Sequence, residues 1–168
     1  MNSFINRGYP KASYNISKNG EINANNLTTR IRQDIPDVES GDFSLVYIYY
    51  LDGTLFPYPN DKSDVLYIGS TIGQKYNKKI SAAFRFVHLR NGQDNKQNIT
   101  LQTYYNNGEK IKLDIYEVDD CRNTEKQWRY EFLQQYGALP IADGAAYSKD
   151  KESFITASND ETIDDQNK

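Results

Sequence analysis

The chain has 168 residues, 38% of them hydrophobic, and a net charge of −3, which most simply describes one domain with tails. Its single cysteine, Cys121, excludes an intramolecular disulfide framework and is typical of a reducing cytoplasm. No apolar run approaches the ~18 residues that span a membrane, and the first residues lack the apolar core of a secretory signal. We therefore expect a cytoplasmic protein with no membrane partner.

The first 42 residues are rich in Asn, Ser and Gly and poor in hydrophobic side chains. This composition predicts that residues 1–42 form an N-terminal arm that is partly disordered or binds a partner. Within it, only residues 26–31 favour a short helix, which would end before Pro36.

Two short runs of Tyr, Ile, Val and Leu follow, at residues 43–51 and 65–68. The segment between them is rich in Gly, Pro, Asn and Asp, which is typical of a β-hairpin with a long loop. The second run ends at Gly69, and a glycine after a strand allows a sharp turn or a close approach to a ligand.

Helices are predicted at residues 78–90, where the apolar side chains form one stripe, and at residues 99–105. Residues 110–118 alternate well enough to form a third strand. A last helix would begin at a cap on Asp119 or Asp120 and end before Gly137.

The predicted order of elements is β-β-α-α-β-α. It indicates an α+β domain at residues 43–147, with a small three-stranded antiparallel sheet flanked by helices. Residues 148–168 are acidic with few hydrophobic side chains, which predicts a disordered tail.

The charge is distributed unevenly along the chain. Residues 71–112 carry eight basic and two acidic side chains, whereas residues 113–168 carry six basic and thirteen acidic ones. A basic middle between acidic ends is typical of a phosphate-binding face on an acidic protein. The alternative is that these lysines lie on a solvated helix.

One carboxylate falls inside a predicted buried stripe. On the last helix Cys121, Trp128, Phe132 and Tyr136 share one face, and Glu125 lies on it. A buried carboxylate needs a cation, a metal or a hydrogen-bond partner. The alternative is a position at the rim of the stripe, where Glu favours the N-terminal end of a helix.

The hairpin resembles the signature of the GIY-YIG nuclease family, in which two strands each offer a tyrosine to one active site. Here Leu45-Val46-Tyr47 stands for the first half, without the family's opening glycine, and Tyr67-Ile68-Gly69 matches the second. Residues 141–144 resemble the closing segment of the homing-endonuclease branch, with Pro140 where that branch has an asparagine. The resemblance covers about residues 43–144 and implies the same order of strands and helices.

The resemblance implies an active site of two tyrosines, an arginine, a histidine and a lysine. On this chain the catalytic candidates are Tyr47, Tyr67, Arg85, His88 and Lys78. Arg85 and His88 are three residues apart and so are neighbours on the polar face of the predicted helix, where the family's usual spacing is four. For His88 the alternative is a surface position, and for the tyrosines, of which the chain has 14, it is a structural role.

Glu125 with Trp128 matches the family's Glu-x-x-Trp pattern, which implies that Glu125 binds Mg²⁺ (or Mn²⁺). Glu131 is the competing carboxylate, but it lacks an aromatic residue three positions on. The further candidates for contact with nucleic acid are Gly69, Ser70, Lys75, Lys79 and Arg90.

The resemblance thus implies a divalent-metal-dependent endonuclease that hydrolyses DNA phosphodiester bonds. Restriction-type relatives embed recognition in arms and insertions, so residues 1–42 and the hairpin loop are candidates for DNA recognition. Such relatives often act as dimers, which makes a homodimer a candidate assembly. A phage or mobile-element nuclease is equally open. One alternative is a non-catalytic nucleic-acid-binding module with the same fold. Another is an interaction protein with an unrelated α+β fold.

Overall fold

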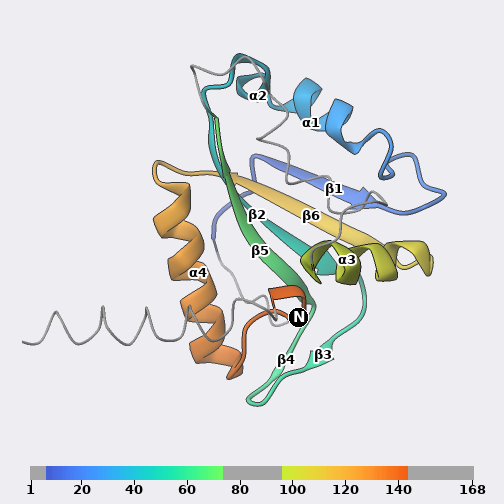
Figure 1. The fold of residues 1–168 in the computed structure, drawn as a ribbon, viewed down its shortest axis with the longest axis vertical. Helices are drawn as coiled ribbons and strands as arrows, with labels where there is room; N and C mark the ends of the chain where they lie inside the picture. Colours follow the sequence, from blue (N-terminus) through green and yellow to red (C-terminus); the bar gives the residue numbers. More distant parts are fainter. Residues whose placement is uncertain (1–6, 74–95, 144–168) are drawn as a thin grey trace, which may run out of the picture.

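The computed structural model describes residues 7–73 and 96–143. In the second range it describes the backbone from residue 96 and the side chains from residue 99. These residues build a four-stranded sheet with the strand order β1-β6-β2-β5 (Figure 1), in which every neighbouring pair is antiparallel. The strands are β1 (Ala12–Ile16), β2 (Ser44–Leu51), β5 (Val65–Ile72) and β6 (Ile111–Glu117). β1 and β5 are therefore the two edges of the sheet.

The predicted hairpin is present, and β5 extends four residues beyond the predicted run at 65–68. Its loop contains a second, two-stranded sheet made of β3 (Phe56–Pro57) and β4 (Lys62–Ser63). Tyr58, between these strands, donates its hydroxyl hydrogen to the Val65 carbonyl oxygen at 3.1 Å. The long loop is thus folded back on the domain.

The helices are α1 (Leu27–Asp34), α2 (Asp37–Ser40), α3 (Lys96–Asn106), α4 (Cys121–Tyr136) and the 3-10 helix η3 (Ile141–Asp143). Of the two predicted caps for α4, Asp120 is the one used, because its carboxylate accepts a hydrogen bond from the Asn123 backbone N–H at 3.1 Å. The helix ends at Gly137, whose φ of 77° lies in the left-handed region that favours glycine.

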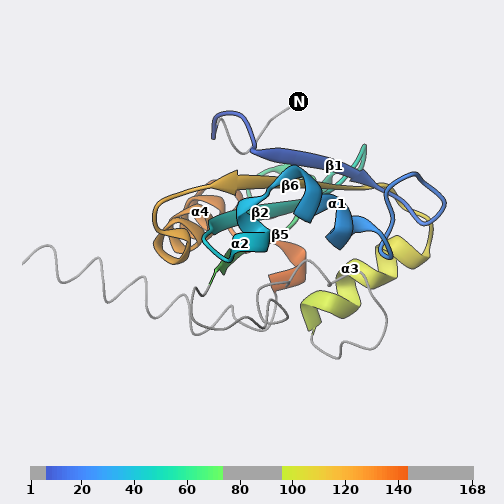
Figure 2. The same ribbon diagram turned by 90° about the horizontal axis from the view of Figure 1, so that it is seen from above.

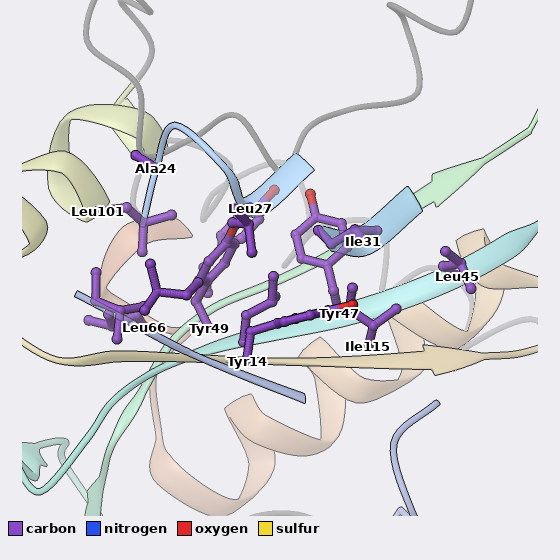
Figure 3. Close-up of a cluster of buried hydrophobic side chains, with 14 of the residues drawn as sticks. Tyr14, Ala24, Leu27, Ile31, Leu45, Tyr47, Tyr49, Leu66, Leu101 and Ile115 are labelled. Atoms are coloured by element: carbon purple, nitrogen blue, oxygen red, sulfur yellow. The ribbon is translucent and has the colours of Figure 1, made fainter. Parts of the chain in front are cut away.

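Helices cover both faces of the sheet (Figures 1 and 2). One face packs on side chains from α1, α2, α3 and η3, and Figure 3 shows its buried cluster, with Tyr47 and Tyr49 of β2 beneath Leu27 and Ile31 of α1. The other face packs on α4, through the predicted stripe of Cys121, Trp128, Phe132 and Tyr136, all of which are buried. We call these the tyrosine face and the α4 face.

The three-stranded sheet predicted from the sequence is wrong, because β1 adds a fourth strand. β1 pairs with β6 and buries Tyr14 and Ile16 on the tyrosine face, while Ser13 and Asn15 are exposed. Leu27 and Ile31 of α1 join the same core. Residues predicted to form an arm therefore contribute to the sheet and its core.

Two predicted segments, the helix at 78–90 and the tail at 148–168, lie outside the described residues. Across residues 7–73 and 96–143, no helix is long and apolar enough to cross a membrane.

Candidate active site on the edge strand

On the tyrosine face, the hairpin brings Tyr47, Tyr67 and Gly69 together. Tyr47 pairs with Gly69 across the two strands, and the ring centroids of Tyr47 and Tyr67 lie 6.1 Å apart. A Cβ atom on Gly69 would lie 2.7 Å from both Cζ and the hydroxyl oxygen of Tyr47, and equally close to Cε1 of Tyr67. Glycine is therefore required at this position, because the Tyr47 ring occupies the space of a side chain.

The two tyrosines differ in exposure. The Tyr47 residue is fully buried, whereas Tyr67 retains 6% of its surface. Both belong to the tyrosine-face core, together with Tyr49, whose pKa is raised above its ordinary value by burial and by the neighbouring Tyr67. Both tyrosines are buried, and Tyr67 is the one of the two that keeps some exposed area.

On the α4 face, the same strand contacts the predicted metal ligand. Ser70 follows Gly69 directly, so its side chain points to the opposite side of β5. Its hydroxyl donates a hydrogen bond to Oε2 of Glu125 on α4. The Glu125 side chain is 21% exposed, so it lies at the rim of the buried stripe and is neither enclosed nor free in solvent.

Glu125 also faces a guanidinium. Nη1 of Arg129, one helical turn further on, lies 3.6 Å from Oε1 of Glu125. Nε of the same Arg129 lies 3.5 Å from Oδ2 of Asp143 in η3, and Asp143 is only 1% exposed. Ser70, Glu125, Arg129 and Asp143 form one connected set, which we call the Glu125 network.

The competing carboxylate, Glu131, has a different environment. It accepts hydrogen bonds from Arg7 and from Gln127, the latter at 2.9 Å, and the Arg7 guanidinium also lies over the Trp128 ring at 5.0 Å. Burial raises the pKa of Glu131, but the bonds from Arg7 and Gln127 outweigh this effect and leave the pKa below its ordinary value. Glu131 therefore holds the N-terminal segment against α4.

The Glu125 carboxylate suits a divalent cation of the Mg²⁺ type. Mg²⁺ is usually bound by one or two carboxylates, with water and substrate phosphates completing the shell. Oε1 of Glu125 lies beyond hydrogen-bonding distance of Arg129 and the side chain is partly exposed, so this oxygen can still coordinate. Among the described residues no three His, Cys, Asp or Glu side chains gather into a larger metal site. Glu125 is thus the carboxylate that could offer such an ion a ligand, through Oε1.

Several site residues predicted from the sequence lie outside the described residues. They are Lys75, Lys78, Lys79, Arg85, His88 and Arg90. The structure places the other five predicted residues in two separate groups on opposite faces of one strand: Tyr47, Tyr67 and Gly69 on the tyrosine face, and Ser70 and Glu125 on the α4 face.

The sequence pointed to neither Arg129 nor the contact that Asp143 makes. The spacing of four between Glu125 and Arg129 is a signal that could have indicated their pairing. The contact of Arg129 with Asp143 joins the middle of α4 to η3 beyond it, so no local pattern predicts it.

Comparison with known proteins finds no family model, no curated protein and no solved structure that matches this chain.

Proposed function

We propose that this protein is a divalent-metal-dependent endonuclease that hydrolyses phosphodiester bonds in DNA, with an active site like that of the GIY-YIG family. The observation that carries the proposal is the composition of strand β5. Within four residues, this edge strand presents Tyr67 beside Tyr47 on one face and, through Ser70, holds Glu125 of α4 on the other. That combination of a tyrosine hairpin and one helical glutamate is what the family resemblance implies.

Each residue has a part in this chemistry. Glu125 would hold the Mg²⁺ or Mn²⁺ ion, which when bound supplies positive charge to the phosphate and to the leaving oxygen. Ser70 orients the Glu125 carboxylate through its hydroxyl. Arg85 would grip the non-bridging phosphate oxygens with its planar guanidinium. Tyr67 would hold the attacking water, and its proton transfer requires a cation nearby because a phenol has a pKa of about 10.

Tyr47 has a supporting part in this proposal. Its ring fills the space above Gly69 and lies against Tyr67, and it has no exposed surface with which to touch a phosphate. We therefore propose that Tyr47 holds Tyr67 in position. Lys78 and His88 are the candidates for lowering the pKa of the Tyr67 phenol and for assisting proton transfer.

Supercoiled plasmid DNA tests the proposal. The purified protein should nick or linearise the plasmid in the presence of Mg²⁺ and leave it intact in EDTA. Tyr67→Phe removes only the hydroxyl and should slow cleavage by at least tenfold, whereas Tyr9→Phe is a matched control at a fully exposed tyrosine and should not. A wild-type protein that binds the plasmid without cutting it in Mg²⁺ or Mn²⁺ would refute the nuclease.

The burial of Tyr47 favours a second candidate function, a nucleic-acid-binding module that retains this fold without catalysis. A tyrosine with no exposed surface is a core residue, and Arg129 already offers Glu125 a cation. This candidate predicts a gel shift of DNA that weakens steeply as salt rises, with no cleavage under any metal.

A further inference from the structure

Arg129 lies between two carboxylates and offers each a different nitrogen. Nη1 is 3.6 Å from Glu125 and Nε is 3.5 Å from Asp143. The Arg129 side chain is 12% exposed, so the charges of this group are poorly screened by water and affect one another strongly. The charge that Glu125 presents to a ligand therefore depends on how its neighbours balance.

The position of Asp143 is fixed by the fold. The preceding residue in η3, Ala142, is part of the tyrosine-face core, and the backbone N–H of Asp143 donates to the Pro140 carbonyl oxygen at 2.8 Å. The backbone N–H of Ile141 donates to the Tyr58 hydroxyl at 3.1 Å. The chain after α4 thus brings a second, buried carboxylate to Arg129, at a nitrogen other than the one that faces Glu125.

The charges have a direct consequence for cation binding. Glu125, Arg129 and Asp143 together carry a net charge of about −1 when all three are ionised. Without the Asp143 charge the sum for these three groups would be about zero, and Asp143 would no longer compete with Glu125 for the guanidinium. Glu125 would then present less negative charge to a dication.

We propose that Asp143 is a positioning residue for the metal site: it draws the Arg129 guanidinium away from Glu125 and balances its charge, so that Glu125 remains available to a divalent cation. This inference rests on the proposed function, because it takes Glu125 as the metal ligand. The family resemblance includes residues 141–143 but gives them no role on this chain. The proposal gives Asp143 the role of positioning Arg129.

The test is direct titration of the intact chain with Mn²⁺, without DNA, by isothermal titration calorimetry. Wild type should bind one Mn²⁺, and Glu125→Gln should remove this binding. Asp143→Asn, which keeps the shape of the side chain, should weaken Mn²⁺ binding at least tenfold. Glu131→Gln, a loss of one carboxylate on the same helix, is the matched control and should change the affinity less than threefold.

A double variant separates charge balance from structural support. Arg129→Gln combined with Asp143→Asn removes both charges of the buried pair, so the net charge returns to about −1 and affinity should return to within threefold of wild type. A merely structural role for Asp143 predicts no such recovery. If Asp143→Asn alone does not fold, the double variant becomes the test: it must fold and bind Mn²⁺ with an affinity within threefold of wild type. A tenfold loss of Mn²⁺ affinity in the double variant overturns the proposal.

The remaining outcomes are equally decisive. Wild-type affinity in Asp143→Asn, or no saturable Mn²⁺ binding by the wild-type chain, overturns the inference. If Mn²⁺ binds through Glu125 as described and the plasmid stays intact, the nuclease proposal fails and the inference about Asp143 stands.

Discussion

The two faces of strand β5 are built differently. On the tyrosine face, Tyr67 and Gly69 lie against Tyr47 in a core where shape decides what fits. On the α4 face, Ser70 meets a chain of charged groups that ends at the buried Asp143. One face of the strand thus belongs to a closely packed core, and the other meets groups whose properties depend on charge balance.

Substitutions on the two faces should therefore have different effects. A change on the tyrosine face alters volume, and its cost should appear in the free energy of unfolding. A change in the Glu125 network alters charge next to a partly exposed carboxylate, and its cost should appear in metal binding and catalysis.

Arg85, which lies outside the described residues, should give the largest effect. If it grips the scissile phosphate, Arg85→Ala should reduce kcat by about 100-fold or more, as for the loss of one charge-stabilising donor. Arg85→Lys should recover little, because an ammonium cannot reproduce the planar two-point contact. Single-turnover cleavage at saturating enzyme measures both. Cleavage by Arg85→Lys at the wild-type rate would move the role to another arginine, with Arg90 the next candidate.

Gly69→Ala tests the packed side of the strand. The new Cβ would lie 2.7 Å from the Tyr47 ring and hydroxyl, so overpacking should cost about 1–3 kcal/mol of unfolding free energy in a denaturant titration. Combining it with Tyr47→Leu removes the clash with Tyr47 but leaves the one with Cε1 of Tyr67, so the double variant should lose less than the sum of the two single losses and still fall below Tyr47→Leu alone. Strict additivity would show that Tyr47 does not occupy the space above Gly69.

The elements that the sequence predicted best are those with strong local signals. The hairpin, β6 and α4 follow from alternating or helical patterns between clear turn residues, and Asp120 and Gly137 mark the ends of α4. β1 was missed because only Tyr14 and Ile16 of its five residues are buried, in a stretch otherwise rich in Asn and Ser. No local rule links them to β6.

The candidate site shows the same division. Glu125 could be found because a carboxylate interrupts a helical stripe, and Tyr67 and Gly69 because they end a strand. The Asp143 contact could not, since it depends on how the chain returns after α4. The position of Ser70 beneath Glu125 likewise follows from packing α4 on β5, which the spacing of residues does not fix.

Arg7→Ala tests the other carboxylate of α4. Losing the bond to Glu131 and the contact with Trp128 should cost about 1 kcal/mol at pH 7, since the pair is partly solvated. The lowered pKa of Glu131 means that the ion pair stabilises the fold above the ordinary glutamate pKa and is lost as pH falls through the folded value. The difference between wild type and Arg7→Ala in urea titrations should therefore shrink below about pH 4.

Lys11→Ala is the matched control for that experiment, because Lys11 and Glu117 form a more exposed ion pair. Because solvent screens this pair, Lys11→Ala should lower the unfolding free energy by less than Arg7→Ala does. An equal loss in both variants would show that Arg7 contributes no more than a surface charge.

Deleting residues 150–168 should have the smallest effect. Their composition offers few side chains to bury, so the Tm should change by less than about 5 °C. A differential scanning calorimetry trace with a larger fall would show that this segment packs on the domain.

A comparison of two carboxylates on α4 decides whether Glu125 is the metal ligand. Glu125→Gln and Glu131→Gln are assayed side by side for Mg²⁺-dependent plasmid cleavage, with their Tm values and DNA affinities recorded. If Glu125 is the metal ligand, Glu125→Gln folds, still binds DNA and does not cut, while Glu131→Gln cuts at nearly the wild-type rate. Cleavage by Glu125→Gln at the wild-type rate, or loss of cleavage only in Glu131→Gln, would contradict the account.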